Sequence, residues 1–488
     1  MSALAIVLHA HLPYVRDDEH PHSRHERWLH EALWECYLPL LDLVGGLVRD
    51  DIAAPITLSV SPTLASMLCD AILKKRFEAH LDAVSELNDR QRGGAFASAA
   101  EHHAERLARA RDTWVKTRGD VLGALAKLHR DGALELMTTA ASHAYLPALG
   151  ASAVRAQLAL GLSSFAELAH IEPCGMWLPE CAIDARIEAI LESLSIDHTV
   201  VDEHAGRAER SEVLESPRGI ACFTRDREAC LRVWSRASGY PGHASYREFH
   251  RDLVHVSDVG ALRGGMTGLK YWRITSRESE DKEPYDAAEA LARADRDADD
   301  YLAWLADRAP LTVLAFDAEL FGHWWFEGPR FLERVLRAAH VVTLASWRGD
   351  ALSPRAPGAS SWGRGGYADP WVGDRNAALW RHVHHTHRLV ETLVRAEPML
   401  GGLRGLALDQ AIRELILLES SDWAFMLDLD SEAAYARARF AWHRARALRF
   451  LAIAAGEASP AEPEARLLRE PSGFLRELAG ERLRSALS

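Results

Sequence analysis

The residue with the clearest chemical potential is Glu180, in the segment CGMWLPECA. It directly follows a short apolar run that contains Trp177, and Pro179 together with the small residues after it indicates a rigid turn. A carboxylate held at such an edge beside an aromatic ring suits the nucleophile of a sugar-cleaving enzyme. The same pattern is equally typical of a solvated loop glutamate, so this motif alone leaves both interpretations open.

A second carboxylate, Asp317, ends the apolar run of LTVLAFDAELFGHWWFEG, and Glu319 stands two positions later. The two side chains share one face if the strand continues through them. Either could be a general acid, because a like-charged neighbour raises the pKa of a carboxyl group toward the range that a proton donor needs. His323, Trp324 and Trp325 follow at once and offer polar contacts and ring faces. The alternative is a hydrogen-bonded strand end with core tryptophans.

Two histidines, His9 and His11, follow the first apolar run in LHAHLPYVR. Alternate residues of a strand point the same way, so this pair could ligate a metal ion, hydrogen-bond a substrate or simply lie in the core. A metal needs ligands at other strand ends, and His143 is the one further imidazole at those positions. Carboxylates among tryptophans suit a sugar better than zinc. A metal-dependent hydrolase that uses His9 and His11 is the remote alternative.

Two aromatic segments stand outside the apolar runs. SSWGRGGYADPW places Trp362, Tyr367 and Trp371 in a glycine-rich loop, and LLESSDWAFML places Asp422 and Trp423 after a helix. Rings in a polar, glycine-rich loop are poorly explained as core residues. We therefore expect them to stack on glucose units.

The order of apolar runs and amphipathic stretches predicts an α/β fold. Strands are expected at 3–8, 56–60, 134–138, 176–178, 199–201, 311–316 and 341–344. Helical stretches alternate with them, and 101–130 is the clearest, so parallel βα units and a barrel are expected. Most of the polar residues above lie at or just beyond a strand's carboxyl end, which is one face of a barrel.

Changes of composition divide the chain. The stretch 187–249 is irregular and charged, and 349–376 is rich in Gly, Pro and Ser and precedes helices at 377–395, 406–419 and 431–457. Three domains are predicted: a catalytic barrel at 1–186 and 250–355, an inserted subdomain with a mobile loop at 187–249, and a helical C-terminal domain at 356–488.

Charge and cysteine usage restrict the class of protein. A formal net charge of -13 repels nucleic acid and anionic membranes and favours a neutral substrate. No apolar run approaches membrane-spanning length, and the N-terminus lacks the basic region of a signal peptide. The six cysteines form no C-x-x-C pair, so we expect a protein of the reducing cytoplasm.

Five segments together resemble the five ordered sequence regions of glycoside hydrolase family 57. They are LHAHLPYVR, GALELMTTAASHAYLP, GMWLPECA, FDAELFGHWW and LESSDWAF. The similarity covers nearly the whole chain and is strongest to the 1,4-α-glucan branching enzymes of that family. It implies an incomplete (β/α)7 barrel with a small inserted subdomain and an all-helical C-terminal domain. No metal or other cofactor is implied.

The resemblance also assigns roles to residues. It makes Glu180 the nucleophile and Asp317, rather than Glu319, the acid/base. It implies substrate contacts at His9, His11, His143, Trp362, Trp371 and Asp422, to which we add Trp177, Trp272, His323 and Trp423. A loop tyrosine that shields the intermediate is expected at Tyr240 of GYPG, with Tyr246 as the alternative.

The implied reaction is the retaining transfer of an α-1,4-glucan segment to a 6-hydroxyl, which makes α-1,6 branches in a glycogen-like glucan. The region between Asp252 and Asp317 is compact, and Trp272 stands in KYWRIT where a second tyrosine is common. The acceptor wall is therefore expected to differ. An α-amylase or 4-α-glucanotransferase of the same family is the nearest alternative, and a non-catalytic glucan-binding protein is another.

Overall fold

The computed structural model describes residues 3–18, 20, 23–206, 210–255, 266–276, 280–308, 310–347 and 353–488. The chain divides into two compact units, each built from three segments. Unit 1 comprises Met1–Leu58, Leu68–Leu136 and Asp226–Trp347, and unit 2 comprises Ser59–Met67, Met137–Arg225 and Arg348–Ser488. The glycine- and proline-rich stretch expected at 349–376 begins outside the described residues, which resume at Ser353.

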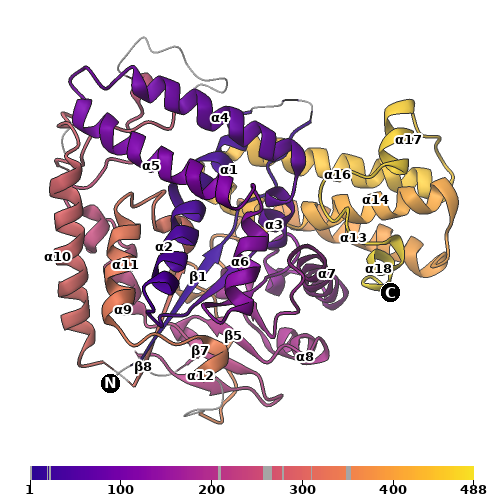
Figure 1. The fold of residues 1–488 in the computed structure, drawn as a ribbon. Helices are drawn as coiled ribbons and strands as arrows, with labels where there is room; N and C mark the ends of the chain where they lie inside the picture. Colours follow the sequence, from indigo (N-terminus) through magenta and orange to yellow (C-terminus); the bar gives the residue numbers. More distant parts are fainter. Residues whose placement is uncertain are drawn as a thin grey trace. The chain divides into compact units, whose positions relative to one another are not determined.

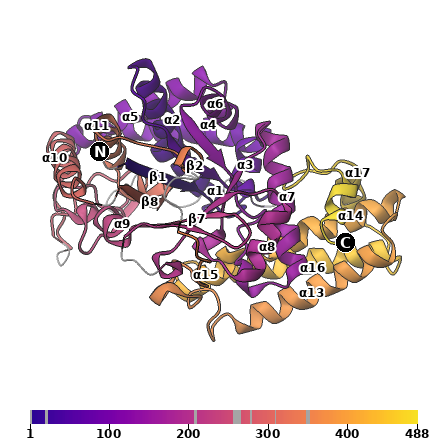
Figure 2. The ribbon, with the colours of Figure 1, turned by 90° about the horizontal axis from the view of Figure 1, so that it is seen from below.

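The first sheet has the strand order β3-β2-β1-β8, and Figure 2 labels β2, β1 and β8 of this sheet. Its strands are β1 (Ala3–Ala10), β2 (Ile56–Val60), β3 (Leu134–Met137) and β8 (Leu311–Asp317). Strands β1 and β8 run parallel, so that Ala3 lies opposite Leu311 and His9 lies opposite Asp317. Every residue of β1 is buried, which is why its sequence is a continuous apolar run rather than an alternating one.

Helices follow the strands of unit 1, and Figure 1 shows α4 and α5 side by side. Their bounds are α1 (Glu26–Ala32), the π-helical turn η1 (Leu33–Tyr37), α2 (Leu38–Arg49), α4 (Ala71–Asp89), α5 (Ala97–Lys116), α6 (Val121–Arg130), α9 (Arg227–Trp234), α10 (Ala287–Leu305), α11 (Gly328–Ala338) and α12 (Leu344–Trp347).

Two predicted elements of unit 1 are wrong. The helix expected at 101–130 is two helices, because Arg118 and Gly119 both adopt positive φ and end α5. A Cβ at Gly119 would also lie 2.8 Å from the ring of Trp114. The strand expected at 341–344 is a single bridge between Leu4 and Val341, because α12 already begins at Leu344.

The second sheet belongs to unit 2 and has the order β4-β5-β7-β6. Strands β4 (Gly175–Trp177), β5 (His198–Val201) and β7 (Ala221–Thr224) run parallel, and β6 (Val213–Glu215) pairs antiparallel with β7. The range 187–249, expected as an irregular insertion, therefore contains strands that continue the sheet of β4. The strand expected at 199–201 is β5, whereas β6 and β7 were not expected, because their hydrophobic runs are short.

The remaining elements of unit 2 are helical. They are α3 (Pro62–Leu68), α7 (Ala151–Ala169), α8 (Ala185–Ser193), α13 (Ala377–Ala396), α14 (Gly402–Leu418), α15 (Ser421–Leu429), α16 (Ala433–Ala455), α17 (Glu462–Arg469) and α18 (Gly480–Ser485). The three C-terminal helices predicted from the sequence match α13, α14 and α16. Helix α14 is buried nearly all round and packs along α16 (Figures 1 and 2). In the described part of the chain, we find no helix whose length and apolar character would let it span a membrane.

Candidate active site

Glu180 stands on a strained turn directly after β4. It lies in the 3-10 turn η3 (Pro179–Cys181) with φ 64° and ψ 23°, and Cys181 follows at φ 51°. Left-handed backbone at a residue with a Cβ costs on the order of 1 kcal/mol or more and persists only where neighbours fix it. Here the amide of Trp362 donates to the Glu180 carbonyl at 2.9 Å. The turn therefore fixes the direction of the Glu180 side chain.

The Glu180 carboxylate is held by donors on both oxygens. The indole Nε1–H of Trp362 donates to Oε2 at 2.8 Å, and the Ser421 hydroxyl donates to Oε1 at 3.1 Å. The side chain is 13% exposed, and His143 Nδ1 lies 3.7 Å from Oε1. Two donors fix the rotamer and stabilise the ionised form. This is the state that a nucleophile requires.

Ser421 connects Glu180 to a second predicted residue. His143 Nδ1 lies 3.0 Å from the Ser421 hydroxyl, and the amide of Ser421 donates to the His143 carbonyl at 3.1 Å. His143 is buried and has φ 58°. The predicted pair Glu180 and His143 thus share one hydrogen-bond network. Sequence reasoning missed Ser421, although it stands next to the predicted Asp422.

The predicted aromatic contacts of unit 2 differ in exposure. Trp362 is half-buried, and its ring meets the edge of Trp177 at a centroid distance of 5.1 Å. Trp177, Trp371 and Trp423 are buried, and Trp371 stacks on Tyr145 at 4.9 Å. We expected Trp371 to lie in an open loop, but its ring belongs to the core. Of these rings, Trp362 is the one placed both at Glu180 and at the surface.

Asp422 is half-buried at the start of α15. The Ser420 hydroxyl donates to its Oδ2 at 2.5 Å, and its own amide donates to the Ser420 oxygen at 3.3 Å. Trp423 next to it donates its indole N–H to the Leu417 carbonyl at 2.9 Å. The Asp422 carboxylate is therefore oriented by its cap residue and stays partly open to solvent.

In unit 1, Asp317 ends β8 opposite His9 of the neighbouring strand. Its side chain is half-buried, whereas His9 is buried. The rings of His9 and His11 lie 5.8 Å apart and nearly parallel. Burial, and then the neighbouring His11, lowers the pKa of His9 well below its usual value. His9 is thus a neutral imidazole beside the carboxylate of Asp317.

Glu319 does not share the face of Asp317, because the strand ends at Asp317 and the 3-10 turn η7 (Ala318–Leu320) begins. Its buried carboxyl group instead accepts hydrogen bonds from the Tyr37 hydroxyl and, at 3.2 Å, from the His11 amide. Burial raises the pKa of Glu319 to about 7, although both donors oppose the rise. Glu319 therefore fastens the His9–His11 segment to the loop after β8.

Glu319 makes stability depend on pH. Its pKa is raised from 4.5 to about 7 in the folded chain, so between these values the unfolded chain ionises Glu319 while the folded chain keeps it protonated. Stability conferred at low pH is therefore lost as the pH rises through about 7. The difference between the two pKa values corresponds to about 3 kcal/mol in the free energy of unfolding. We expect Glu319→Gln to gain this amount relative to the unmodified chain between pH 4.5 and 8, as measured by urea unfolding.

The control for this prediction is Glu86→Gln, because Glu86 is exposed on α4. Its unfolding curve is expected to follow that of the unmodified chain at every pH. If the free energy of unfolding of Glu319→Gln also has the same pH dependence as that of the unmodified chain, the prediction is wrong.

A buried ion pair lies behind this loop. Arg247 donates to Glu35 at 2.5 Å with both side chains fully buried, and His323 Nδ1 lies 2.5 Å from the other Glu35 oxygen. Burial by itself raises the pKa of Glu35, but Arg247 and then His323 hold it well below its usual value. The predicted substrate residue His323 is therefore fixed on Glu35.

The π-helical turn η1 sets up these contacts. It presents Glu35 to Arg247, the Cys36 thiol to the Ala318 carbonyl at 3.0 Å, and Tyr37 to Glu319. The approach is so close that a Cβ at Gly322, where φ is 118°, would lie 1.9 Å from the Glu35 carbonyl oxygen. Short π-helices are frequent at functional sites. Sequence reasoning missed Glu35, Tyr37 and Arg247, since nothing in the local pattern marks them.

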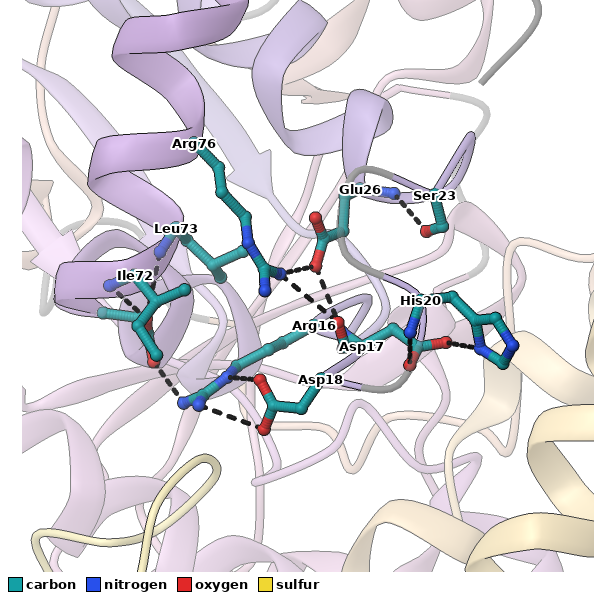
Figure 3. Close-up of polar contacts among 10 residues, drawn as sticks. Arg16, Asp17, Asp18, His20, Ser23, Glu26, Ile72, Leu73 and Arg76 are labelled. Carbon is teal, nitrogen blue, oxygen red and sulfur yellow. Dashed lines mark hydrogen bonds and ion pairs between the residues drawn. The ribbon is translucent and has the colours of Figure 1, made fainter. Parts of the chain in front are cut away.

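The segment after His11 is anchored by charged residues, as Figure 3 shows. Arg16 donates to Asp18 and, at 2.6 Å, to Asp70, which caps α4 through the amides of Ile72 and Leu73. A second group nearby joins the buried Glu26 to Arg76 and to the amide of Asp17. The motif LHAHLPYVR is thus held in place beyond its histidines.

The two candidate loop tyrosines both contact α10. The Tyr240 hydroxyl donates to Asp300 at 2.7 Å, and the Tyr246 hydroxyl donates to Asp297 at 2.5 Å. Tyr240 is half-buried and Tyr246 is buried. Trp272 is also buried, with its ring 4.8 Å from that of Phe96. The roles of these three residues stay predictions.

The clusters with the spacing of metal ligands do not include His9 or His11. Within the described ranges they are Glu31, Glu35 and His323 in unit 1, and Asp202, Glu203 and His204 in unit 2. Each already has an arginine, since Arg247 donates to Glu35 and Arg225 donates to Asp202 at 2.7 Å. A guanidinium in contact with the carboxylates competes with a cation for the same oxygens.

Two family models match the chain. The model described as glycosyl hydrolase family 57 matches residues 5–344. The model described as 1,4-alpha-glucan branching enzyme, C-terminal, matches residues 382–472. All five segments on which the resemblance rests lie within these two matches.

Three known proteins are similar over nearly the whole chain. A probable 1,4-alpha-glucan branching enzyme of Mycobacterium tuberculosis is 33% identical over 98% of this chain and 97% of its own. The crystal structure of a branching enzyme from Thermococcus kodakaraensis has a TM-score of 0.88 at 28% identity, over 99% of this chain and 96% of its own. The crystal structure of an alpha-amylase from Thermotoga maritima has a TM-score of 0.88 at 29% identity, over 99% of both chains.

These likenesses confirm the predicted fold class. Without the antiparallel β6, the two sheets contribute seven strands among the described residues. This number agrees with an incomplete (β/α)7 barrel, and the C-terminal part is helical as expected.

Proposed function

Since this chain belongs to glycosyl hydrolase family 57, we propose that it is a 1,4-α-glucan branching enzyme that acts on a glycogen-like glucan in the cytoplasm. The observation that carries the proposal is the match of residues 382–472 to the C-terminal region of such enzymes. Two relatives of that name, which match 90% and 98% of this chain, support it. The net charge of -13 is compatible with a neutral polysaccharide.

In the first half of the proposed reaction, Glu180 attacks the anomeric carbon of an α-1,4-linked glucose unit. A covalent bond to the Glu180 oxygen forms while the bond to the departing glycosidic oxygen breaks, and Asp317 gives that oxygen a proton. Trp362 and Ser421 support this role because they orient the attacking carboxylate. The product is a glycosyl-enzyme with inverted configuration.

In the second half, Asp317 takes the proton from the 6-hydroxyl of an acceptor glucan. The acceptor oxygen then displaces Glu180 from the anomeric carbon, and the second inversion restores the α configuration. Water in place of the acceptor would give hydrolysis. The amount of branching therefore depends on how well acceptor groups exclude water.

We propose different positions for the predicted contact residues. His9, His11, His143, Trp362 and Asp422 contact substrate directly, a role supported by their placement around Glu180 and Asp317 within their own units. The buried rings of Trp177, Trp272, Trp371 and Trp423 support those contacts from behind, and His323 is positioned by Glu35. Tyr240 shields the intermediate after its hydroxyl leaves Asp300, and Tyr246 stays in the core.

The domain limits also form part of the proposal. The barrel comprises 1–186 and 250–355, the inserted subdomain with its mobile loop 187–249, and the helical domain 356–488. The match at 382–472 lies wholly within the last of these and supports its separate character.

An α-amylase is the second candidate function. The observation in its favour is the Thermotoga maritima structure, whose printed name is alpha-amylase and whose TM-score equals that of the branching enzyme. Both activities use the same first half-reaction, so they differ in the acceptor. Fold similarity alone cannot rank two acceptors.

The deciding measurement is proton NMR of amylose before and after incubation with the purified chain. We expect new α-1,6 anomeric signals with few new reducing ends, and a debranching enzyme should remove the new signals. A rise of reducing ends without α-1,6 signals would instead identify an α-amylase. Redistributed chain lengths with neither signal would identify a 4-α-glucanotransferase.

A further inference from the structure

Two tryptophans of unit 1 have strongly exposed side chains. Trp234 is 45% exposed and Trp324 is 39% exposed, and every other tryptophan in the described part of the chain is buried or half-buried. Large rings are normally buried, so neighbouring exposed ones commonly mark a binding surface. Neither residue takes part in the chemistry proposed above.

The two rings touch although they stand ninety positions apart in the sequence. Their centroids are 5.6 Å apart and their planes cross at 82°. Trp234 is the last residue of α9, and Trp324 lies in the loop that follows β8 and η7. In an edge-to-face pair the edge of one ring meets the face of the other, and both rings here are also open to solvent.

Both rings stand on ordered backbone. The amide of Trp324 donates to the Glu319 carbonyl at 3.0 Å, and the preceding His323 is fixed on Glu35. Behind Trp234, the amide of Ser235 closes α9 by donating to the Leu231 carbonyl at 2.8 Å. The pair is therefore formed before any ligand arrives, which lowers the entropy cost of binding.

We propose that Trp234 and Trp324 form a docking platform for an α-1,4-glucan chain, separate from the residues that contact the reacting sugar. The platform rests on the proposed function, because it supplies the same glucan. Indole faces suit the C–H faces of pyranose rings. An α-1,4-glucan coils, so its successive rings turn, and two perpendicular indoles meet two different rings of one chain.

The position of Trp324 relates this platform to the reaction. It lies seven residues after Asp317 in the same loop, and its amide is bonded to Glu319, two residues after Asp317. A chain that rests on the platform is thereby kept at the carboxyl end of β8. A long glucan can bind the platform and the reacting residues at once, which raises its affinity. An oligosaccharide too short to span both does not gain this affinity.

The test compares the double variant Trp234→Ala/Trp324→Ala with the unmodified chain on amylose and on a short maltooligosaccharide. We expect KM for amylose to rise about tenfold with kcat nearly unchanged, and both constants for the short substrate to stay the same. Retardation of the double variant in a native gel that contains glycogen should fall by a similar factor. Equal losses on long and short substrates would overturn the proposal.

Trp304→Ala is the matched control. Trp304 is also in unit 1 and half-buried, but the guanidinium groups of Arg232 and Arg308 each lie 4.2 Å from its ring centroid and occupy its faces. Its removal should leave glycogen retardation unchanged. If it weakens retardation as much as the double variant does, the effect is structural and the platform is wrong.

Glycogen retardation also separates this proposal from the proposed function. Retardation that depends on the two tryptophans in a chain without branching activity would leave the platform standing and remove the branching function. Branching with retardation independent of them would do the reverse. A change of oligomeric state in the double variant, with glycogen affinity intact, would show that the pair binds protein and would overturn the platform.

Discussion

Replacing Glu180 with glutamine is expected to lower kcat for glucan transfer by at least about 10⁴-fold. An amide cannot form the covalent intermediate. The fold should survive, because the amide oxygen can accept from Trp362 while the Ser421 hydroxyl turns to accept from the new NH2 group. Initial rates of branching on amylose measure the loss, and circular dichroism at rising temperature measures the fold.

Two comparisons make this result specific. Glu192→Gln changes an exposed glutamate of the same unit, which pairs with Arg218 on the surface, and should keep full activity. Azide should restore turnover to Glu180→Ala and release a β-glycosyl azide, because it attacks from the face that the nucleophile vacates. Asp317→Ala with azide should release the α-anomer. If Glu180→Ala released the α-anomer and Asp317→Ala the β-anomer, Asp317 would be the nucleophile and Glu180 the acid/base.

Replacing Arg247 with methionine is expected to lower the free energy of unfolding by about 3 to 5 kcal/mol. The change leaves the carboxylate of Glu35 buried without its main partner. It also removes the hydrogen bond from Arg247 to the His323 carbonyl at 2.7 Å and the guanidinium 3.9 Å above the Phe326 ring. Denaturant unfolding at pH 7 measures the loss.

Arg334→Met is the control for the second prediction. Its partner Asp299 and Arg334 itself are both exposed, so the free energy of unfolding should change little. The double variant Arg247→Met/Glu35→Met removes both charges and should recover part of the stability that the single change loses. If the double variant is no more stable than the single one, the lost packing of Arg247 rather than the unpaired charge explains the effect.

The strands could be predicted where the sequence contains an uninterrupted run of apolar residues. The runs at 3–8, 56–60 and 311–316 are continuous and apolar because these strands are covered on both faces. The break between α5 and α6 could not be predicted, because the apolar period continues on either side of Gly119. The run at 341–344 looks like a strand but contributes one bridge, since its last residue starts α12.

The candidate site shows a similar limit. The local sequence pattern around Glu180 fits a nucleophile and a surface loop equally well, and the family resemblance is what favours the nucleophile. Neither source indicated Ser421 or Arg247, whose bonds to Glu180 and Glu35 bridge 241 and 212 positions. Such partners are set by the fold rather than by neighbouring residues. The exposure of Trp324 and the burial of Trp371 were likewise decided by packing.

The distance along the chain between Glu180 and its partners has a consequence for synthesis in the cell. Ribosomes add roughly 5 to 20 residues per second, so Ser421 leaves the ribosome about 10 to 50 s after Glu180. Throughout that interval the turn after β4 lacks the Ser421 donor to the Glu180 carboxylate, and for most of it the turn also lacks the Trp362 donor. A nascent chain that already contains Glu180, the proposed nucleophile, therefore cannot yet orient its carboxylate. We expect activity only after α15 has been translated.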